Sequence, residues 1–202
     1  MHQAGEFRIA RAAPALLYVF LQAMLGVMRR RQAELGRRLV TRGRTMAARD
    51  PAMAEYDEAL GRLVSSLQTL ELLMRLFLHS KGPAGGSSAD LDALERALPG
   101  ALVPLDAFTD YRSLGQLISA CRNVRGGPVV DAAIVRLRDA LAHGRVYAKS
   151  AGPPLHLLKF GKQQGGMVPI EYNESISLDW LARQQAFCDR QLQSVYDSLN
   201  AA

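Results

Sequence analysis

The chain of 202 residues has few of the side chains that build metal centres, cofactor sites or disulfide frameworks. Its two cysteines, Cys121 and Cys188, stand far apart and match neither a metal-ligand spacing nor a disulfide framework. We expect both to be small apolar core groups in a protein of the reducing cytoplasm. A Gly-rich phosphate loop, a nucleophile elbow and an internal repeat are also missing. The sequence therefore predicts no metal site and no cofactor.

Aromatic residues are scarce as well, at 6% of the sequence, although hydrophobic residues make up 49%. Ala, Leu and Arg recur at helical spacing instead, which favours packing between helices. The length allows one ordinary core with an appendage. We predict a mainly α fold, a helical bundle of about five helices with a small β-hairpin before the last helix.

Positive charge is concentrated in residues 1–49, which contain ten arginines against two glutamates. The composition changes abruptly at Asp50, so we expect a basic leader over 1–49 and a helical domain over 50–202. The leader is interpreted either as an added helix or as a wrongly assigned start, with the natural chain beginning at Met46 or Met53.

An apolar run over residues 12–28 of the leader lies at the lower limit of length for a membrane span. Pro14, Gln22 and Gly26 interrupt it, and arginines rather than a small-residue cleavage site follow it. These features disfavour a membrane helix and a secretory signal. A protein anchored in a membrane by this run is nevertheless kept as a hypothesis, ranked after the two that are given below.

Apolar residues spaced alternately by three and four predict a long helix from Asp50-Pro51 to the stop at Lys81-Gly82-Pro83. Its apolar seam is expected to pack inside the domain, with a dimer seam as the alternative. A last helix should begin after the N-cap Ser177, reach Leu199 and pack beside the long helix. Shorter helices are predicted over residues 91–98, 109–123 and 128–143.

After Gly144 the spacing of apolar residues changes from about 3.6, as in a helix, toward two, as in a strand. Residues 155–160 and 167–172 flank a Gly-rich turn, and they predict a β-hairpin. Pro169 restricts the second strand to the edge of a sheet, because proline lacks the N–H that a ladder requires.

The helix expected before Gly144 ends in Arg136-Leu-Arg-Asp-Ala-Leu-Ala-His-Gly144, the stretch with the most reactive combination of side chains. Residues four apart share one helix face, so Asp139 is placed to hydrogen-bond His143 and to raise its basicity. Arg138 comes close to His143 if the last turn opens at Gly144. An imidazole can move a proton, and a guanidinium can bind two phosphate oxygens. These residues suit phosphodiester cleavage without a metal, with His143 as general acid or base and Arg138 stabilising the transition state.

Basic residues surround this motif. From Arg112 to Lys162 the chain has nine basic side chains against two acidic ones. Arg136, Arg145 and Lys149 lie nearest to the motif and are candidates for phosphate contacts. A solvated surface with flexible basic side chains explains the same charges equally well.

The segment Arg138-Asp-Ala-Leu-Ala-His143 resembles the R-x(4–6)-H motif of HEPN domains, including the polar residue often found after its arginine. Leu70-Glu-Leu-Leu-Met-Arg-Leu-Phe-Leu78 resembles the early long helix of that family. The resemblance spans 50–202 and implies a helical bundle that forms a homodimer with two motifs in one cleft. Many members are metal-independent endoribonucleases of toxin-antitoxin, phage-defence or CRISPR-linked systems, which cut through attack of the RNA 2′-hydroxyl.

By matching position, the resemblance makes Arg138 and His143 the catalytic pair and Asp139 the auxiliary polar residue. RNA is then the substrate, the basic neighbours of the motif are RNA contacts, and a cognate antitoxin protein is a possible partner. No DNA specificity is inferred. One chain supplies one such histidine, and a symmetric dimer supplies the second for a two-sided acid–base mechanism.

A second hypothesis from another class is a non-catalytic helical module that binds protein or RNA. In that case Arg138, Asp139 and His143 only cap and salt-bridge the end of a helix. His156, which precedes Lys159 in the expected hairpin, is either an ordinary surface residue or an aid to RNA binding.

Overall fold

The computed structural model describes residues 51–82, 88–106, 108–150 and 152–201. The basic leader expected over 1–49, with its apolar run and the alternative start at Met46, lies outside the described residues. The chain divides into two compact units, and the larger one comprises 50–86 and 102–201. Helix α3 (Ser88–Arg96) belongs to the other unit. No helix among the described residues combines the length and the apolar character needed to cross a membrane.

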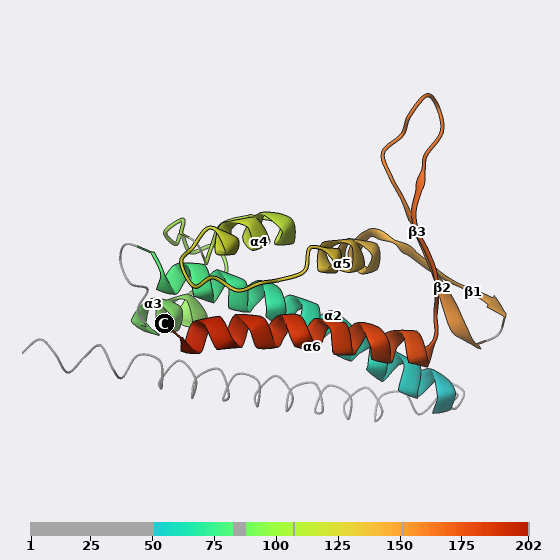
Figure 1. The fold of residues 1–202 in the computed structure, drawn as a ribbon, viewed down its shortest axis with the longest axis horizontal. Helices are drawn as coiled ribbons and strands as arrows, with labels where there is room; N and C mark the ends of the chain where they lie inside the picture. Colours follow the sequence, from blue (N-terminus) through green and yellow to red (C-terminus); the bar gives the residue numbers. More distant parts are fainter. Residues whose placement is uncertain (1–50, 83–87, 107, 151, 202) are drawn as a thin grey trace, which may run out of the picture. The chain divides into compact units, whose positions relative to one another are not determined.

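The described chain is mainly α-helical, with five helices and a three-stranded antiparallel sheet before the last helix, which confirms the expected fold class (Figure 1). The helices of the larger unit are α2 (Pro51–Ser80), α4 (Leu114–Arg122), α5 (Ala133–His143) and α6 (Leu178–Asn200). The strands, in the spatial order β1-β2-β3, are β1 (Arg145–Ser150), β2 (Gly152–Phe160) and β3 (Ile170–Ile176).

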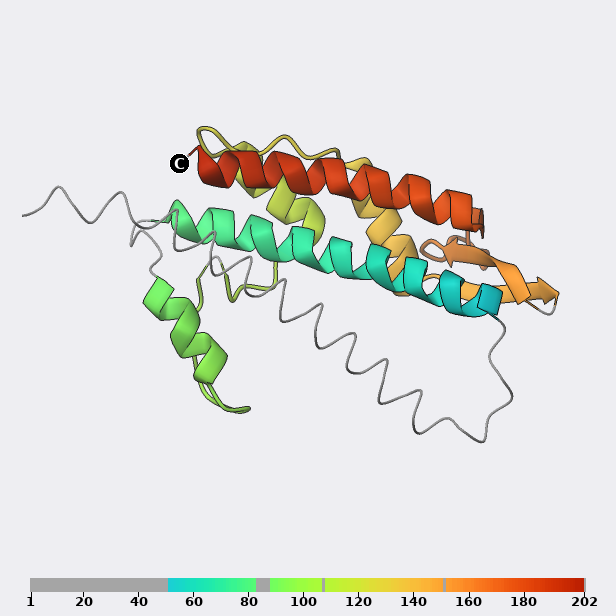
Figure 2. The same ribbon diagram turned by 90° about the horizontal axis from the view of Figure 1, so that it is seen from below.

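The two long helices α2 and α6 form the centre of the larger unit, as the sequence predicted. They lie side by side and run in the same direction (Figures 1 and 2). The seam of α2 is buried because its apolar residues recur every three or four positions, and each buried Leu or Phe contributes about 1.5–3 kcal/mol. The N-cap Ser177 accepts a hydrogen bond from the Trp180 N–H at 3.1 Å. Fully buried seam residues are Tyr56, Leu63, Leu70, Met74 and Phe77.

Helix α4 begins at Leu114, five residues later than predicted. Ser113 is its N-cap and forms a capping box with Gln116. Before it, the Asp106 carboxylate accepts hydrogen bonds from backbone N–H groups, which offers the chain an alternative to the helix. Tyr111 precedes the helix, and its side chain is fully exposed.

Helix α5 also begins later than predicted, at Ala133 rather than at Pro128. The stretch before it lies along α6 in the opposite direction. The Val129 N–H donates to Ser194 Oγ at 3.1 Å, and the Asp131 N–H donates to Gln191 Oε1 at 2.8 Å. Side chains of α6 therefore satisfy backbone groups that a helix would otherwise have paired.

The expected hairpin is present as β2 and β3, and the sheet has an additional strand, β1, that the sequence did not predict. Strand β3 begins directly after Pro169 and is an edge strand, as expected. One face of the sheet packs on the helices, where Leu157 and Ile176 are completely buried. The sheet thus continues from the end of α5 and leads the chain back to the start of α6 (Figure 1).

Candidate functional site

Helix α5 carries the predicted motif on its flank. Ile134, Leu137 and Ala140 are buried, so one face of the helix is held against the core. Arg138 and His143 lie to the side of this buried face and remain accessible to solvent. The packing of α5 therefore fixes the backbone from which both candidate side chains project.

Gly144 ends α5, but not in the left-handed conformation of a typical helix C-terminus. Its φ and ψ are −76° and 167°, and its N–H donates to the Ala140 carbonyl at 2.8 Å. A Cβ at this position would collide with the Ala140 carbonyl oxygen and with Leu157 Cδ1. Glycine is required here for space, because the chain passes closely between the last helical turn and strand β2.

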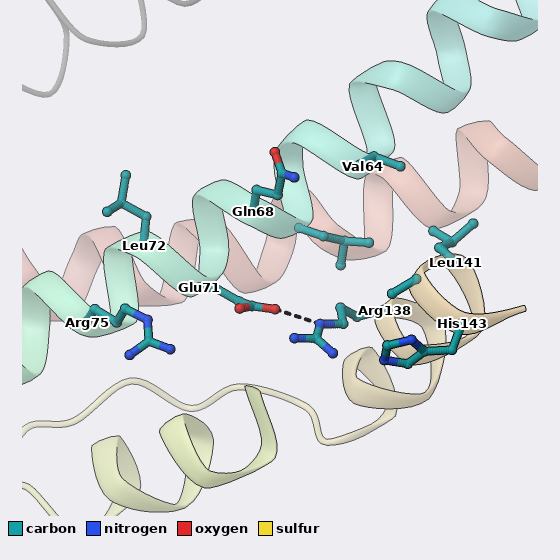
Figure 3. A pocket seen from close by; sticks show the side chains of 10 residues that line it. Val64, Gln68, Glu71, Leu72, Arg75, Arg138, Leu141 and His143 are labelled. Carbon is teal, nitrogen blue, oxygen red and sulfur yellow. Dashed lines mark hydrogen bonds and ion pairs between the residues drawn. The ribbon is translucent and has the colours of Figure 1, made fainter. Parts of the chain in front are cut away.

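A groove of about 510 Å³ separates α2 from α5 (Figure 3). Both catalytic candidates, Arg138 and His143, project into it from α5, and α2 forms the opposite wall. The structure thus brings together the arginine and the histidine that the sequence singled out. The wall residues from α2 are Val64, Leu67, Gln68, Glu71, Leu72 and Arg75.

Two carboxylates hold the guanidinium of Arg138. Its Nε donates to Glu71 Oε1 at 2.7 Å, and its Nη1 donates to Asp139 Oδ1 at 2.9 Å. The hydrogen bond and charge of Glu71, with a smaller effect of Asp139, raise the pKa of Arg138 above its ordinary value. The Nη2 amino group has no hydrogen-bond acceptor among the described residues, so a fixed cation with an open donor faces the groove.

His143 differs from the prediction in one contact. Asp139 does not hydrogen-bond it, since that carboxylate is bound to Arg138, its neighbour in sequence. A permanent cation attracts the carboxylate more strongly than a neutral imidazole does. His143 is exposed, and its side chain makes no hydrogen bond within the described part of the chain. Its ring is therefore free to contact a ligand in the groove.

Arg75 marks the other end of the groove, on α2. Its Nη1 donates to the carbonyl oxygen and to Oδ1 of Asp110, both at 2.7 Å, and its Nη2 donates to the Arg112 carbonyl at 2.8 Å. These bonds fasten the segment before α4 to the long helix. Arg75 is thus mainly a structural residue, although it lines the groove.

Glu71 and Arg75 were missed as site residues by the sequence analysis. A signal was present, because both are charged side chains on an otherwise apolar stretch of the long helix and lie four positions apart. Their partners Arg138 and Asp110 come from distant parts of the sequence, and spacing along one helix cannot reveal such pairs.

The three candidate RNA contacts do not line this groove. Arg136 faces a second groove of about 420 Å³, together with Asp139, Lys159, Glu171 and Tyr172. Arg145 lies over the ring of Phe160, with 5.1 Å from Cζ to the ring centroid. Lys149 is exposed on β1. The predicted basic residues therefore belong to the neighbouring groove and to the sheet.

No group of three His, Cys, Asp or Glu side chains could hold a metal ion in the described part of the chain. Burial raises the pKa of the Cys121 thiol to about 11 and that of Cys188 to about 12. Both cysteines are buried, as the sequence predicted. Comparisons with models of known families, with curated proteins and with solved structures find no match for this chain.

Proposed function

We propose that this chain is a metal-independent endoribonuclease of the HEPN type, acting in a toxin-antitoxin or phage-defence system. The observation that carries the proposal is the shared groove, in which the fixed guanidinium of Arg138 and the unengaged imidazole of His143 face the same space. These two groups match the needs of RNA cleavage through its own 2′-hydroxyl, namely proton transfer and stabilisation of phosphate charge.

In the proposed reaction, the 2′-oxygen of RNA attacks the adjacent phosphorus and the bond from phosphorus to the 5′-oxygen breaks. One imidazole accepts the proton of the 2′-hydroxyl, and a second imidazole, in its protonated form, gives its proton to the leaving 5′-oxygen. The products are a 2′,3′-cyclic phosphate and a free 5′-hydroxyl. The Nη2 group of Arg138 supplies hydrogen bonds to the phosphate oxygens as their charge increases.

Asp139 acts through Arg138 in this mechanism. Together with Glu71 it fixes the guanidinium plane, so that the remaining N–H donors point in a defined direction. Asp139 is therefore a positioning residue rather than a group that touches RNA.

A homodimer completes the proposed site. One chain provides His143 as the single histidine of the groove, whereas acid–base cleavage uses two proton-transfer groups. A two-fold symmetric dimer would supply the second copy of Arg138 and His143. In a toxin-antitoxin system, a cognate antitoxin protein would bind this assembly and block cleavage.

One observation favours the alternative function, a non-catalytic helical module that binds protein or RNA. Arg138 is already engaged by two carboxylates, and no hydrogen bond from a described residue orients the His143 ring. This arrangement also suits a salt-bridged helix end. The two functions differ in whether RNA is cut, so an activity measurement separates them.

The test incubates the full chain with structured and single-stranded RNAs in the presence of EDTA. Wild type is compared with His143→Ala and Arg138→Ala. The control is Arg62→Ala, which removes an exposed arginine of α2 that does not line the groove. We expect cyclic-phosphate ends from wild type and Arg62→Ala and loss of cleavage in the other two variants. Specific activity should fall on dilution in parallel with dissociation of the dimer, measured by light scattering.

Cleavage that survives His143→Ala contradicts the assignment of the site. A folded dimer that binds RNA without cutting any of the substrates supports the interaction module instead.

A further inference from the structure

The outer face of the sheet has a composition that the proposed cleavage groove does not explain. In the register of the sheet, Tyr147 pairs with His156 and His156 pairs with Ser175, so these three side chains share one face. Leu157 and Ile176 occupy the other face, which packs on the helices. The sheet therefore has one covered face and one face toward solvent.

Two aromatic contacts lie on this outer face. The rings of Tyr147 and His156 are stacked, with 5.6 Å between their centroids and 28° between their planes. Next to them the guanidinium of Arg145 covers the ring of Phe160. Tyr147 is 41% exposed, a large value for a tyrosine in a paired strand. Flat π surfaces and a cation are thus side by side on an accessible sheet.

The charges near this face are mainly positive. Arg145 and Lys149 project from β1, which contains no acidic residue, and β2 contains none either. Of the two glutamates in β3, Glu174 is exposed but pairs with Leu157, so it lies on the opposite side of the sheet, and Glu171 is bound by Lys159. A polyanion approaching the outer face therefore meets cations without a free carboxylate of these strands on the same face.

We propose that the outer face of the sheet binds a single-stranded segment of RNA. One base stacks on the Tyr147–His156 pair, a second stacks near Phe160 and Arg145, and Arg145 and Lys149 contact the phosphates. The proposal rests on the proposed function in identifying the ligand as the RNA to be cut. Strand β1 starts immediately after Gly144, so a strand of RNA held there leads directly to His143.

Single-stranded RNA fits this surface better than a duplex does. Bases in a duplex are stacked on one another and cannot place a face against a protein ring, whereas unpaired bases can. The outer face therefore selects unpaired RNA and positions it for the groove.

The test measures binding separately from cleavage. The probe is a fluorescein-labelled 2′-O-methyl RNA of about 12 nucleotides, within the usual range of site sizes, and it lacks the attacking hydroxyl. Fluorescence anisotropy with the full chain compares the single strand with its duplex. The variants are Tyr147→Ala, Tyr147→Phe and, as a control, Tyr111→Ala, which removes a fully exposed tyrosine from the segment before α4.

We expect wild type to prefer the single strand, and Tyr147→Ala to raise its Kd about tenfold, the usual effect of removing one stacked base. Tyr147→Phe keeps the ring and should bind like wild type, as should Tyr111→Ala. Equal binding by Tyr147→Ala and wild type, equal binding of duplex and single strand, or no binding at all overturns the proposal. Circular dichroism checks that each variant is folded, and Arg145→Gln provides a second variant with an expected loss of several fold.

The two proposals fail in different ways. If wild type binds the probe through Tyr147 but cuts no RNA, RNA binding by the outer face is supported and the ribonuclease proposal is contradicted. If RNA is cut and Tyr147→Ala leaves KM unchanged, the ribonuclease proposal is supported and RNA binding by the outer face is contradicted.

Discussion

Two arginines line the groove between α2 and α5, and the chain uses them differently. Arg75 donates to two backbone carbonyl groups and one carboxylate, all within the segment that leads to α4. Arg138 donates only to carboxylate side chains, Glu71 and Asp139, and its Nη2 has no acceptor among the described residues. Arg75 is also less exposed, at 16% against 27% for Arg138.

The comparison teaches that the partners of a charged residue, more than its place in a pocket, indicate its role. Backbone carbonyls as partners tie an arginine to the position of a loop, and replacing it disturbs the fold. Carboxylate side chains as partners orient an arginine and leave its remaining donors to a ligand. Variants of the two residues should therefore separate stability from activity.

The largest effect is expected for Arg138→Ala. Loss of a charged donor at the phosphate should lower kcat for RNA cleavage by about 10²–10³-fold. Because the side chain is partly exposed, the free energy of unfolding should change by only about 1 kcal/mol. Single-turnover kinetics and urea denaturation measure the two quantities. A loss of activity that only follows a loss of folded protein would contradict the functional role of Arg138.

Arg75→Ala is expected to have the opposite profile. It leaves the Asp110 carboxylate and two carbonyl groups without their donor, so the free energy of unfolding should fall by about 2–3 kcal/mol. The folded variant should retain kcat within a few fold of wild type. Urea denaturation provides the stability, and activity is measured at a temperature where the variant is folded. A stable but inactive Arg75→Ala variant would contradict the structural role assigned to Arg75.

The ion pair of Arg75 should also be visible as a pH dependence of stability. Burial alone would raise the pKa of Asp110, but hydrogen bonds from Arg112 and Arg75 outweigh it and lower the pKa below its ordinary value. A carboxyl with a lowered pKa stabilises the fold above its unfolded pKa of about 3.9, and this contribution disappears as the pH falls through the folded value.

Wild type and Asp110→Asn should therefore differ by about 1–2 kcal/mol in unfolding free energy at neutral pH. The two should begin to converge near about pH 4 and meet only below the lowered pKa of the folded state. Urea denaturation across this pH range measures the difference. A gap that stays constant down to acidic pH would mean that the charge of Asp110 is not its source.

The smallest effect is expected for Asp139→Asn. Glu71 still holds Nε of Arg138, and an asparagine can still accept from Nη1, so kcat should fall only several fold. Glu71→Gln is the matched variant on the other side of the guanidinium and should cost a similar factor. A loss as large as that of Arg138→Ala would instead indicate that Asp139 acts on His143, the partner that the sequence spacing suggested.

Features encoded within one element could be predicted from the sequence. The bounds of α2 follow from a period that serves one buried seam, and the start of α6 follows from its N-cap Ser177. That Arg138 and His143 lie near one another was also predicted, because both are on one helix.

Features that depend on distant partners could not be predicted. Asp139 was expected to bind His143 along the helix, but the cation beside it is a stronger partner. Strand β1 forms because β2 offers it a ladder, and its own six residues carry little signal. Glu71 acquires its role only when α5 packs opposite α2.

The parallel arrangement of α2 and α6 has a consequence for synthesis on the ribosome. The Gln185 amide meets Ser66 Oγ at 2.8 Å across 119 positions of sequence. Helix α6 leaves the ribosome after every other described element, on the order of ten seconds after α2 at usual rates of translation. During that interval the seam of α2 lacks its longest partner, and the wall of the groove is not yet fixed. The fold, and any activity of the groove, is therefore completed after translation of α6 rather than progressively during it.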